Sequence, residues 1–143
     1  MTIHKRWGLM SLANDLKKIV PPEFVKVDSE TLAAYSHDQS FVPTSNPDVV
    51  VCPQTVEHIQ AIIRLANQTN TPITPYSSGL NLHGASIPQR GGILLNLSRM
   101  NTIIEVNEED WFAMIEPGVT YQQLQDIKSY VNSTDLNISK KIT

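Results

Sequence analysis

The sequence contains a single cysteine, Cys52, among its 143 residues, and it has no long run of apolar residues. One cysteine excludes an intramolecular disulfide and any metal site built from several cysteines, so we expect Cys52 to be a small buried residue at the end of a strand. No stretch approaches the roughly 20 apolar residues that a membrane span requires. The apolar residues of the N-terminal segment are too scattered for a signal peptide. The sequence therefore predicts a cytoplasmic protein without a membrane span.

A strong charge of one sign is also lacking. The formal net charge is -3, without a long run of like charge, and this balance gives no indication of nucleic acid or an anionic membrane as a partner. His4, His37 and His58 lie far apart and show no ligand spacing, which argues against a metal site. The sequence is 41% hydrophobic and 17% charged, a composition that indicates one globular domain with a core.

The N-terminal part predicts two short helices. Leu9 to Ile19 places its apolar residues at helical spacing, and Pro21 then ends this helix. Val25 to Val27 is a short extended piece. A second short helix begins at Asp28 or Ser29, either of which can cap it.

A strand, a helix and a second strand follow in about 25 residues, which predicts a βαβ unit. Val49 to Cys52 is an apolar run that indicates a buried strand. Thr55 to Asn67 has one apolar stripe of helical period. The residues that we expect to pack on the sheet from this helix are Ile59, Ile62 and Ile63. Ile73 to Thr74 begins the next strand, and the connection predicts a parallel pair with a right-handed crossover.

Three further apolar runs, Ile93 to Asn96, Ile103 to Val106 and Phe112 to Ile115, read as strands, and the last two are joined by an acidic turn whose length suits a hairpin. Thr120 and Gln123 form a capping-box pair at the start of another helix. We therefore predict an α+β fold with a small mixed or parallel sheet and flanking helices.

The segment best suited to chemistry is the loop from Tyr76 to Gly84. It follows a strand, it is rich in small residues, and Gly79 and Gly84 can adopt positive φ. Consecutive backbone N–H groups in such a loop can surround a phosphate. A plain connection is the alternative, because serine and glycine are common in turns. The loop has neither the G-x-G-x-x-G nor the G-x-x-x-x-G-K-[ST] signature.

The order of these parts resembles the FAD-binding domain of the p-cresol methylhydroxylase and vanillyl-alcohol oxidase superfamily, and within it the branch of the glycolate oxidase subunit and D-lactate dehydrogenase. Asp38 also fits the lead-in that is usual in this family. The matching motifs are Asp48–Pro53, Pro72–Pro75 before the small-residue loop, Gly91–Asn101, Ile104–Val106, and Glu116–Thr120 with Leu124.

The resemblance implies FAD as the cofactor, and it assigns the pyrophosphate to the loop. Tyr76, Ser77 and Ser78 stand where the family usually has Arg-Gly-Gly, so one cationic side chain is replaced and the geometry of the loop is altered. We assign no catalytic residue and no metal ligand to this chain. The residues that we assign to the cofactor are Tyr76, Ser77, Ser78, Gly79, Leu80, Asn81, His83, Gly84, Pro53 and Gly118.

The resemblance also implies a division of the chain and a reaction. Residues 1–46 are N-terminal helices and a lead-in, residues 47–127 are a first FAD-binding subdomain, and residues 128–143 are a divergent tail. The family's second FAD-binding half and its substrate domain are not in this sequence. The implied activity is oxidation of a small 2-hydroxy acid of the glycolate or D-lactate type, with weak or no binding of FAD by the chain alone.

Two alternatives to that activity stay open. The first is a truncated, non-catalytic module, or a subunit whose flavin site is completed by a second polypeptide or by a homodimer partner. The second is the flavin subunit of another enzyme that shares the domain, such as a cell-wall reductase or a molybdenum hydroxylase.

Three single residues near these elements have competing interpretations. His83 is either an ordinary loop histidine or a residue that contacts the flavin. In relatives with covalently bound flavin, a histidine near this loop can be the attachment point, so this role is a third alternative. Arg99 follows a strand, from which it either reaches a phosphate or, as we expect, forms an ion pair at the surface. We expect Trp111 to be a packing residue.

Overall fold

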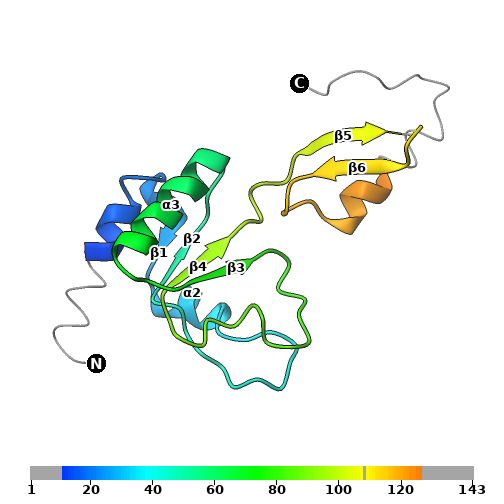
Figure 1. Ribbon diagram of the computed structural model, residues 1–143. Coiled ribbons are helices and arrows are strands. Elements are labelled where there is room, and N and C mark those ends of the chain that lie inside the picture. Colours follow the sequence, from blue (N-terminus) through cyan, green and yellow to red (C-terminus); the bar gives the residue numbers. More distant parts are fainter. Residues whose placement is uncertain (1–10, 108, 127–143) are drawn as a thin grey trace.

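The computed structural model describes residues 11–107 and 109–126 of the chain, and it has the predicted α+β fold (Figure 1). Residues 11–16 and 121–126 are helical at either end. Between them lie η1 (Pro22–Phe24), β1 (Val25–Lys26), α2 (Ser29–Ala34), β2 (Val49–Val51), α3 (Val56–Gln68), β3 (Ile73–Tyr76), β4 (Ile93–Asn96), β5 (Ile103–Asn107) and β6 (Phe112–Ile115). In the described part of the chain, no helix has the length and apolarity to cross a membrane.

The main sheet has four strands in the order β1-β2-β4-β3, in which β1 is antiparallel and the other three are parallel. The predicted parallel orientation of β2 and β3 is confirmed, but the prediction that they pair is wrong, because β4 lies between them. Burial explains this order: all four residues of β4 are buried. β3 contains Pro75, which has no N–H to donate to a ladder and is therefore suited to an edge.

Helix α3 begins and packs as its sequence predicts, with one exception. The side chain of Thr55 accepts a hydrogen bond from the backbone N–H of His58, which caps the helix. Ile62 and Ala66 are buried against the sheet, and Ile59 is partly buried. Ile63 was expected on this face but is 42% exposed, because it is turned by about 100° from Ile62 around the helix.

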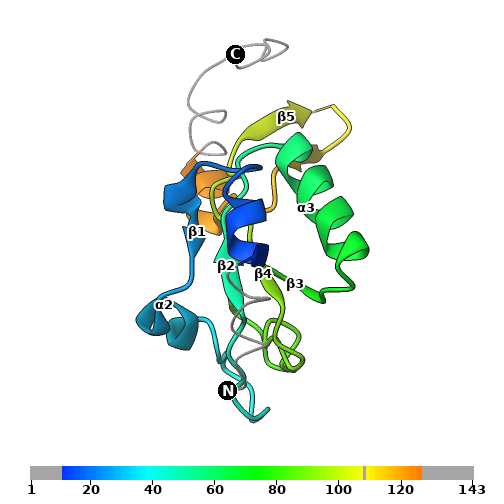
Figure 2. The same cartoon turned by 90° about the vertical axis from the view of Figure 1, so that its left-hand side faces the viewer.

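The core lies between the sheet and two helices, the one at residues 11–16 and α3, which Figure 2 shows on the same side of the sheet. Alternate strand residues point to this face. The strand residues in this core are Val25, Val49, Val51, Ile93 and Leu95. Val50, Leu94 and Asn96 are also buried and alternate with them, so the opposite face of the sheet is covered as well.

Strands β5 and β6 form a separate two-stranded antiparallel sheet, as the hairpin prediction required. Asn107 and Asp110 close its turn, because the side chain of Asn107 accepts from the N–H of Asp110 and donates to its carboxylate. All four residues of β6 are exposed. Trp111 has a φ of 58° and is 92% exposed, so the prediction that it packs is wrong. The turn places its indole in solvent.

Candidate functional site

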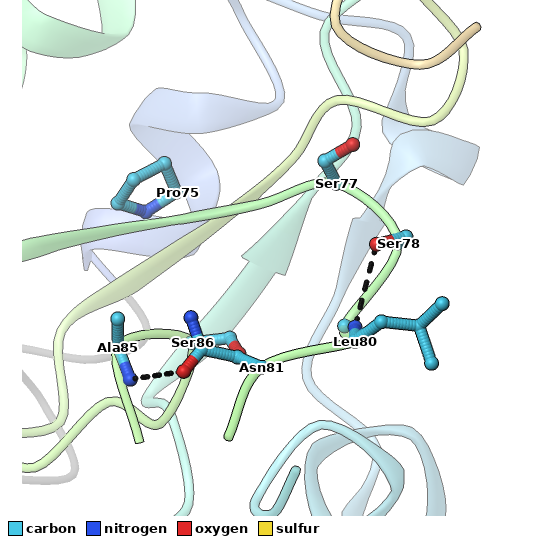
Figure 3. A pocket seen from close by; sticks show the side chains of 8 residues that line it. Pro75, Ser77, Ser78, Leu80, Asn81, Ala85 and Ser86 are labelled. Carbon is cyan, nitrogen blue, oxygen red and sulfur yellow. Dashed lines mark hydrogen bonds between the residues drawn. The ribbon is translucent and has the colours of Figure 1, made fainter. Parts of the chain in front are cut away.

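An open depression of about 220 Å³ lies where β3 leaves the sheet (Figure 3). It lies beyond the carboxyl end of a parallel strand, which is where ligands bind in open sheets of this kind. Five of the ten predicted cofactor residues line it. The lining residues are Pro75, Ser77, Ser78, Gly79, Leu80, Asn81, Ala85 and Ser86.

The two loop glycines adopt the conformation that the sequence predicted. Gly79 has a φ of 71° and Gly84 a φ of 76°. A Cβ at Gly79 would overlap the hydroxyl of Tyr76, and a Cβ at Gly84 would lie 2.6 Å from a methyl group of Val42. Both positions therefore require glycine for their backbone angle and for their space.

Side chains of the loop fix its shape from within. The amide oxygen of Asn81 accepts hydrogen bonds from the backbone N–H groups of His83 at 2.8 Å and of Ala85 at 3.3 Å. The hydroxyl oxygen of Ser78 accepts from the N–H of Leu80 (Figure 3). The side-chain oxygens of Asn81 and Ser78 thus support the loop backbone.

Three consecutive backbone donors remain at the depression. The N–H groups of Ser77, Ser78 and Gly79 donate to no acceptor within residues 11–107 and 109–126. Ser77 and Ser78 are exposed and Gly79 is partly exposed, so these N–H groups are accessible to water or to a ligand. Their position on the wall of the depression makes them the donors best placed to bind an anion.

The near end of the loop is attached to a turn far away in sequence. The hydroxyl of Ser77 donates a hydrogen bond to the carbonyl of Pro117. The N–H of Gly118 donates to the carbonyl of Met100 at 2.7 Å, and a Cβ at Gly118 would approach the carbonyl of Leu97. Gly118 therefore allows this turn to approach the end of β4, next to the loop, although it does not line the depression.

The other predicted site residues lie outside the depression. Pro53, two residues after the end of β2, is fully buried, and His83 is exposed. Neither lines the depression, and neither do Tyr76 or Gly84. In the described chain, no group of three His, Cys, Asp or Glu residues could hold a metal ion.

Two lining residues after Gly84, Ala85 and Ser86, were missed by the sequence analysis. Ser86 is buried, and its hydroxyl donates to the carboxylate of Asp38 at 3.2 Å. The available signal was the lack of any periodicity from Tyr76 to Gly92, which indicates one long loop and not a loop that ends at Gly84.

A polar cluster supports the start of the loop. The side-chain amide of Asn96 donates to the hydroxyl of Tyr35 at 2.7 Å, and the ring of Tyr35 meets that of Tyr76 edge-on at 4.9 Å. Burial raises the pKa of Tyr35, and the nearby Cys52 adds to this shift. Tyr76 is thus held between the end of α2 and Gly79.

Cys52 and Arg99 lie near this cluster. Cys52 follows β2 and is half-buried. Burial raises its thiol pKa, and the charges of Arg99 and Lys26 oppose that effect. The guanidinium of Arg99 lies 4.3 Å from the ring centre of Phe24. Arg99 therefore makes a cation–π contact, and the prediction that it forms a surface ion pair is wrong, since none involving it occurs among the described residues.

Comparison with known proteins gives a consistent set of relatives. A family model described as an FAD binding domain matches residues 47–130. D-2-hydroxyglutarate dehydrogenase of Stutzerimonas stutzeri (strain A1501) is 35% identical over 117 residues, which are 80% of this chain and 25% of that protein. Glycolate oxidase subunit GlcD of Bacillus subtilis (strain 168) is 35% identical over 96 residues, 66% of this chain and 20% of that protein.

A solved structure supports the same relationship. The crystal structure of p-cresol methylhydroxylase with substrate bound has a TM-score of 0.79 at 31% sequence identity, and the match covers 87% of this chain and 25% of that one. The chain thus spans about a quarter or less of the length of these relatives.

Proposed function

This chain belongs to the FAD-binding domain family, as its motifs predicted, and on that premise we propose that it supplies the pyrophosphate-binding part of a flavin site. FAD is the cofactor of this family. The observation that carries the proposal is the run of three consecutive N–H donors, Ser77, Ser78 and Gly79, on the wall of the depression. Backbone N–H groups bind phosphate oxygens well where small residues allow close approach.

The residues of the loop fit the diphosphate better than they fit the whole cofactor. The depression of about 220 Å³ is smaller than the roughly 300 Å³ at which ligand pockets usually begin. The residues that line it offer hydrogen-bond donors and no cation. Of the ten predicted cofactor residues, we therefore propose contacts to the diphosphate from the five that line the depression, Ser77 to Asn81. The other five, Tyr76, His83, Gly84, Pro53 and Gly118, would act through the backbone that they shape.

The reaction and its substrate are properties of a whole enzyme, in which an FAD-binding domain is one part. FAD, when bound, would accept a hydride from the substrate. The relatives named above are a dehydrogenase of D-2-hydroxyglutarate and a subunit of glycolate oxidase. We propose a small 2-hydroxy acid as the substrate class, because both of these names refer to one. The task of the described residues is to bind and orient the cofactor, and we assign none of them to proton transfer.

A second candidate is a module that is completed by another polypeptide. One relative is itself described as a flavoprotein subunit, the 4-cresol dehydrogenase [hydroxylating] subunit of Pseudomonas putida. Under either proposal the chain alone binds FAD weakly, since affinity depends on completed contacts.

The test is a titration of the ¹⁵N-labelled chain with FAD, followed by NMR. We expect weak binding, with the largest amide shifts at Ser77, Ser78 and Gly79, and smaller ones for riboflavin, which has no diphosphate. Gly79→Ala should weaken the FAD response because it distorts the loop. Gly91→Ala is the matched control, since Gly91 also has a positive φ but does not line the depression. No shift at Ser77, Ser78 and Gly79 in the unmodified chain would refute the proposal.

A further inference from the structure

The far half of the loop is held by a segment about 45 residues earlier in the chain. Residues 38–45 run beside residues 84–89, and side chains of both segments make the contacts. These contacts join Asp38 to Ser86, Ser45 to the carbonyl of Pro88, Gln89 to the carbonyl of Pro43, and Val42 to the backbone of Gly84. Ser77 and Pro117 hold the near half in a similar way, so the loop is anchored at both ends.

Asp38 is the ionisable group in this contact. One carboxylate oxygen accepts from the N–H of Ser40 at 2.8 Å, and the other accepts from the hydroxyl of Ser86 at 3.2 Å. The Ser40 side chain lowers the pKa of Asp38 most, and the N–H of Ser40, the hydroxyl of Ser86 and the N–H of Gly84 lower it further, against an opposing effect of burial. Ser86 is buried and lines the depression, whereas Asp38 does not line it. The carboxylate therefore lies outside the depression and acts on the loop through the hydroxyl of Ser86 and the backbone N–H of Gly84.

We propose that Asp38 is a positioning residue for the cofactor loop, and that it holds residues 84–86 opposite the N–H groups of Ser78 and Gly79 through its contact with Ser86. The proposal rests on the proposed function of this loop. The positioning role and simple electrostatics predict opposite changes in FAD affinity when Asp38 is substituted. A carboxylate repels an anionic ligand, so charge alone predicts tighter binding of FAD when Asp38 is neutralised. Positioning predicts weaker binding when the contact is lost.

Two substitutions separate the effects. Asp38→Ala removes both the charge and the contact, and we expect FAD to bind about fivefold more weakly, which corresponds to the loss of one hydrogen bond. Asp38→Asn removes the charge but keeps an amide oxygen for Ser40 and an amide nitrogen that can bond the Ser86 hydroxyl. We expect Asp38→Asn to bind FAD as well as the unmodified chain or better.

Ser86→Ala gives an independent measurement through the other partner. It should weaken FAD binding less than Asp38→Ala does, because Asp38 also interacts with Ser40 and with the backbone of Gly84. The double variant should be no weaker than Asp38→Ala, because the contact between the two residues can be lost only once. Asp28→Ala is the control for loss of a carboxylate that caps a backbone N–H. Asp28 accepts from the N–H of Thr31 at 2.8 Å at the start of α2 and does not line the depression.

The measurement is the same NMR titration with FAD, accompanied by thermal unfolding of each variant. A tighter or unchanged affinity in Asp38→Ala, or an additive double variant, would overturn the positioning role while the proposed function stands. A loss of affinity in Asp28→Ala equal to that in Asp38→Ala would also overturn it. Absence of any loop response in the unmodified chain would overturn both proposals. If Asp38→Ala does not fold, Ser86→Ala and Asp38→Asn decide the question.

Discussion

The carboxylate of Asp48 accepts a hydrogen bond from the backbone N–H of Gly92 at 2.8 Å, while the N–H of Asp48 donates to the carbonyl of Gly92 at 2.8 Å. This two-way contact joins the residues that immediately precede β2 and β4. These strands pair in register from Val49 and Ile93 onward. The contact therefore sets the alignment of the two central strands, on which the position of the cofactor loop depends.

We expect Asp48→Ala to lower the free energy of unfolding by about 1–3 kcal/mol, because a partly buried N–H loses a charged acceptor. Urea unfolding followed by circular dichroism measures this change. Asp48→Asn keeps one oxygen acceptor and should cost less. Equal losses in the two variants would show that the hydrogen bond to Gly92 contributes nothing.

Gly92→Ala should be more damaging than Asp48→Ala. Gly92 has a φ of 79°, and an added Cβ would overlap the backbone carbonyl of Pro72. The left-handed conformation and the overlap together should cost at least about 2 kcal/mol. Gly91→Ala is the comparison, since its φ of 67° is similar but its Cβ would meet only the side chain of Asp48, at 2.9 Å. A Gly92→Ala protein as stable as Gly91→Ala would contradict the prediction.

Tyr35 should make the stability of the chain dependent on pH in the alkaline range. Burial raises its pKa above the ordinary value of 10.0, so the folded state holds the phenol proton more tightly than the unfolded state. The stabilisation is complete below the unfolded pKa and is lost as pH rises through the folded pKa. Between about pH 9 and about pH 11, the unmodified chain should lose more stability than Tyr35→Phe.

Tyr35→Phe should also cost about 1 kcal/mol at neutral pH, because the amide of Asn96 loses an acceptor at a position that is 5% exposed. Tyr121→Phe, at an exposed tyrosine, is the control. Denaturant unfolding at a series of pH values measures both effects. An equal alkaline loss in Tyr35→Phe and the unmodified chain would assign the pH dependence to other groups.

Local patterns were sufficient to predict each strand and the helix α3. Each strand is a short apolar run, and proline or glycine bounds most of them, while α3 has a capping threonine before a stripe of helical period. The position of β4 between β2 and β3 was not predictable, since strand order depends on which faces become buried after the chain collapses. Trp111 has no local signal for its exposure, which follows from the turn that it occupies.

The site was predictable in part for the same reason. The positive-φ glycines and the small residues of the loop are local features, and five lining residues were identified from them. The contact between Asp38 and Ser86 joins residues 48 apart. No spacing rule relates such positions, and only the folded structure brings them together.

We predict that the isolated chain self-associates, because two leucines of the loop are exposed. Leu80 and Leu82 are 73% and 69% exposed. Figure 3 shows the side chain of Leu80 projecting outward. Large apolar patches are uncommon on soluble monomers, and a two-fold contact between copies is the simplest way to cover one. A cover formed by residues 129–143 is the alternative to self-association, and these residues lie outside the described part of the chain.

Sedimentation velocity over a concentration series measures the association. Leu80→Ser with Leu82→Ser should shift the chain toward monomer, while Trp111→Ser, at an exposed hairpin residue remote in sequence, should not. Leu80 also lines the depression, so FAD and a second copy would compete for the same surface. Excess FAD should then favour the monomer by mass action. Monomer at every concentration, or association reduced by Trp111→Ser and not by the leucine variants, would show that this face is not the contact.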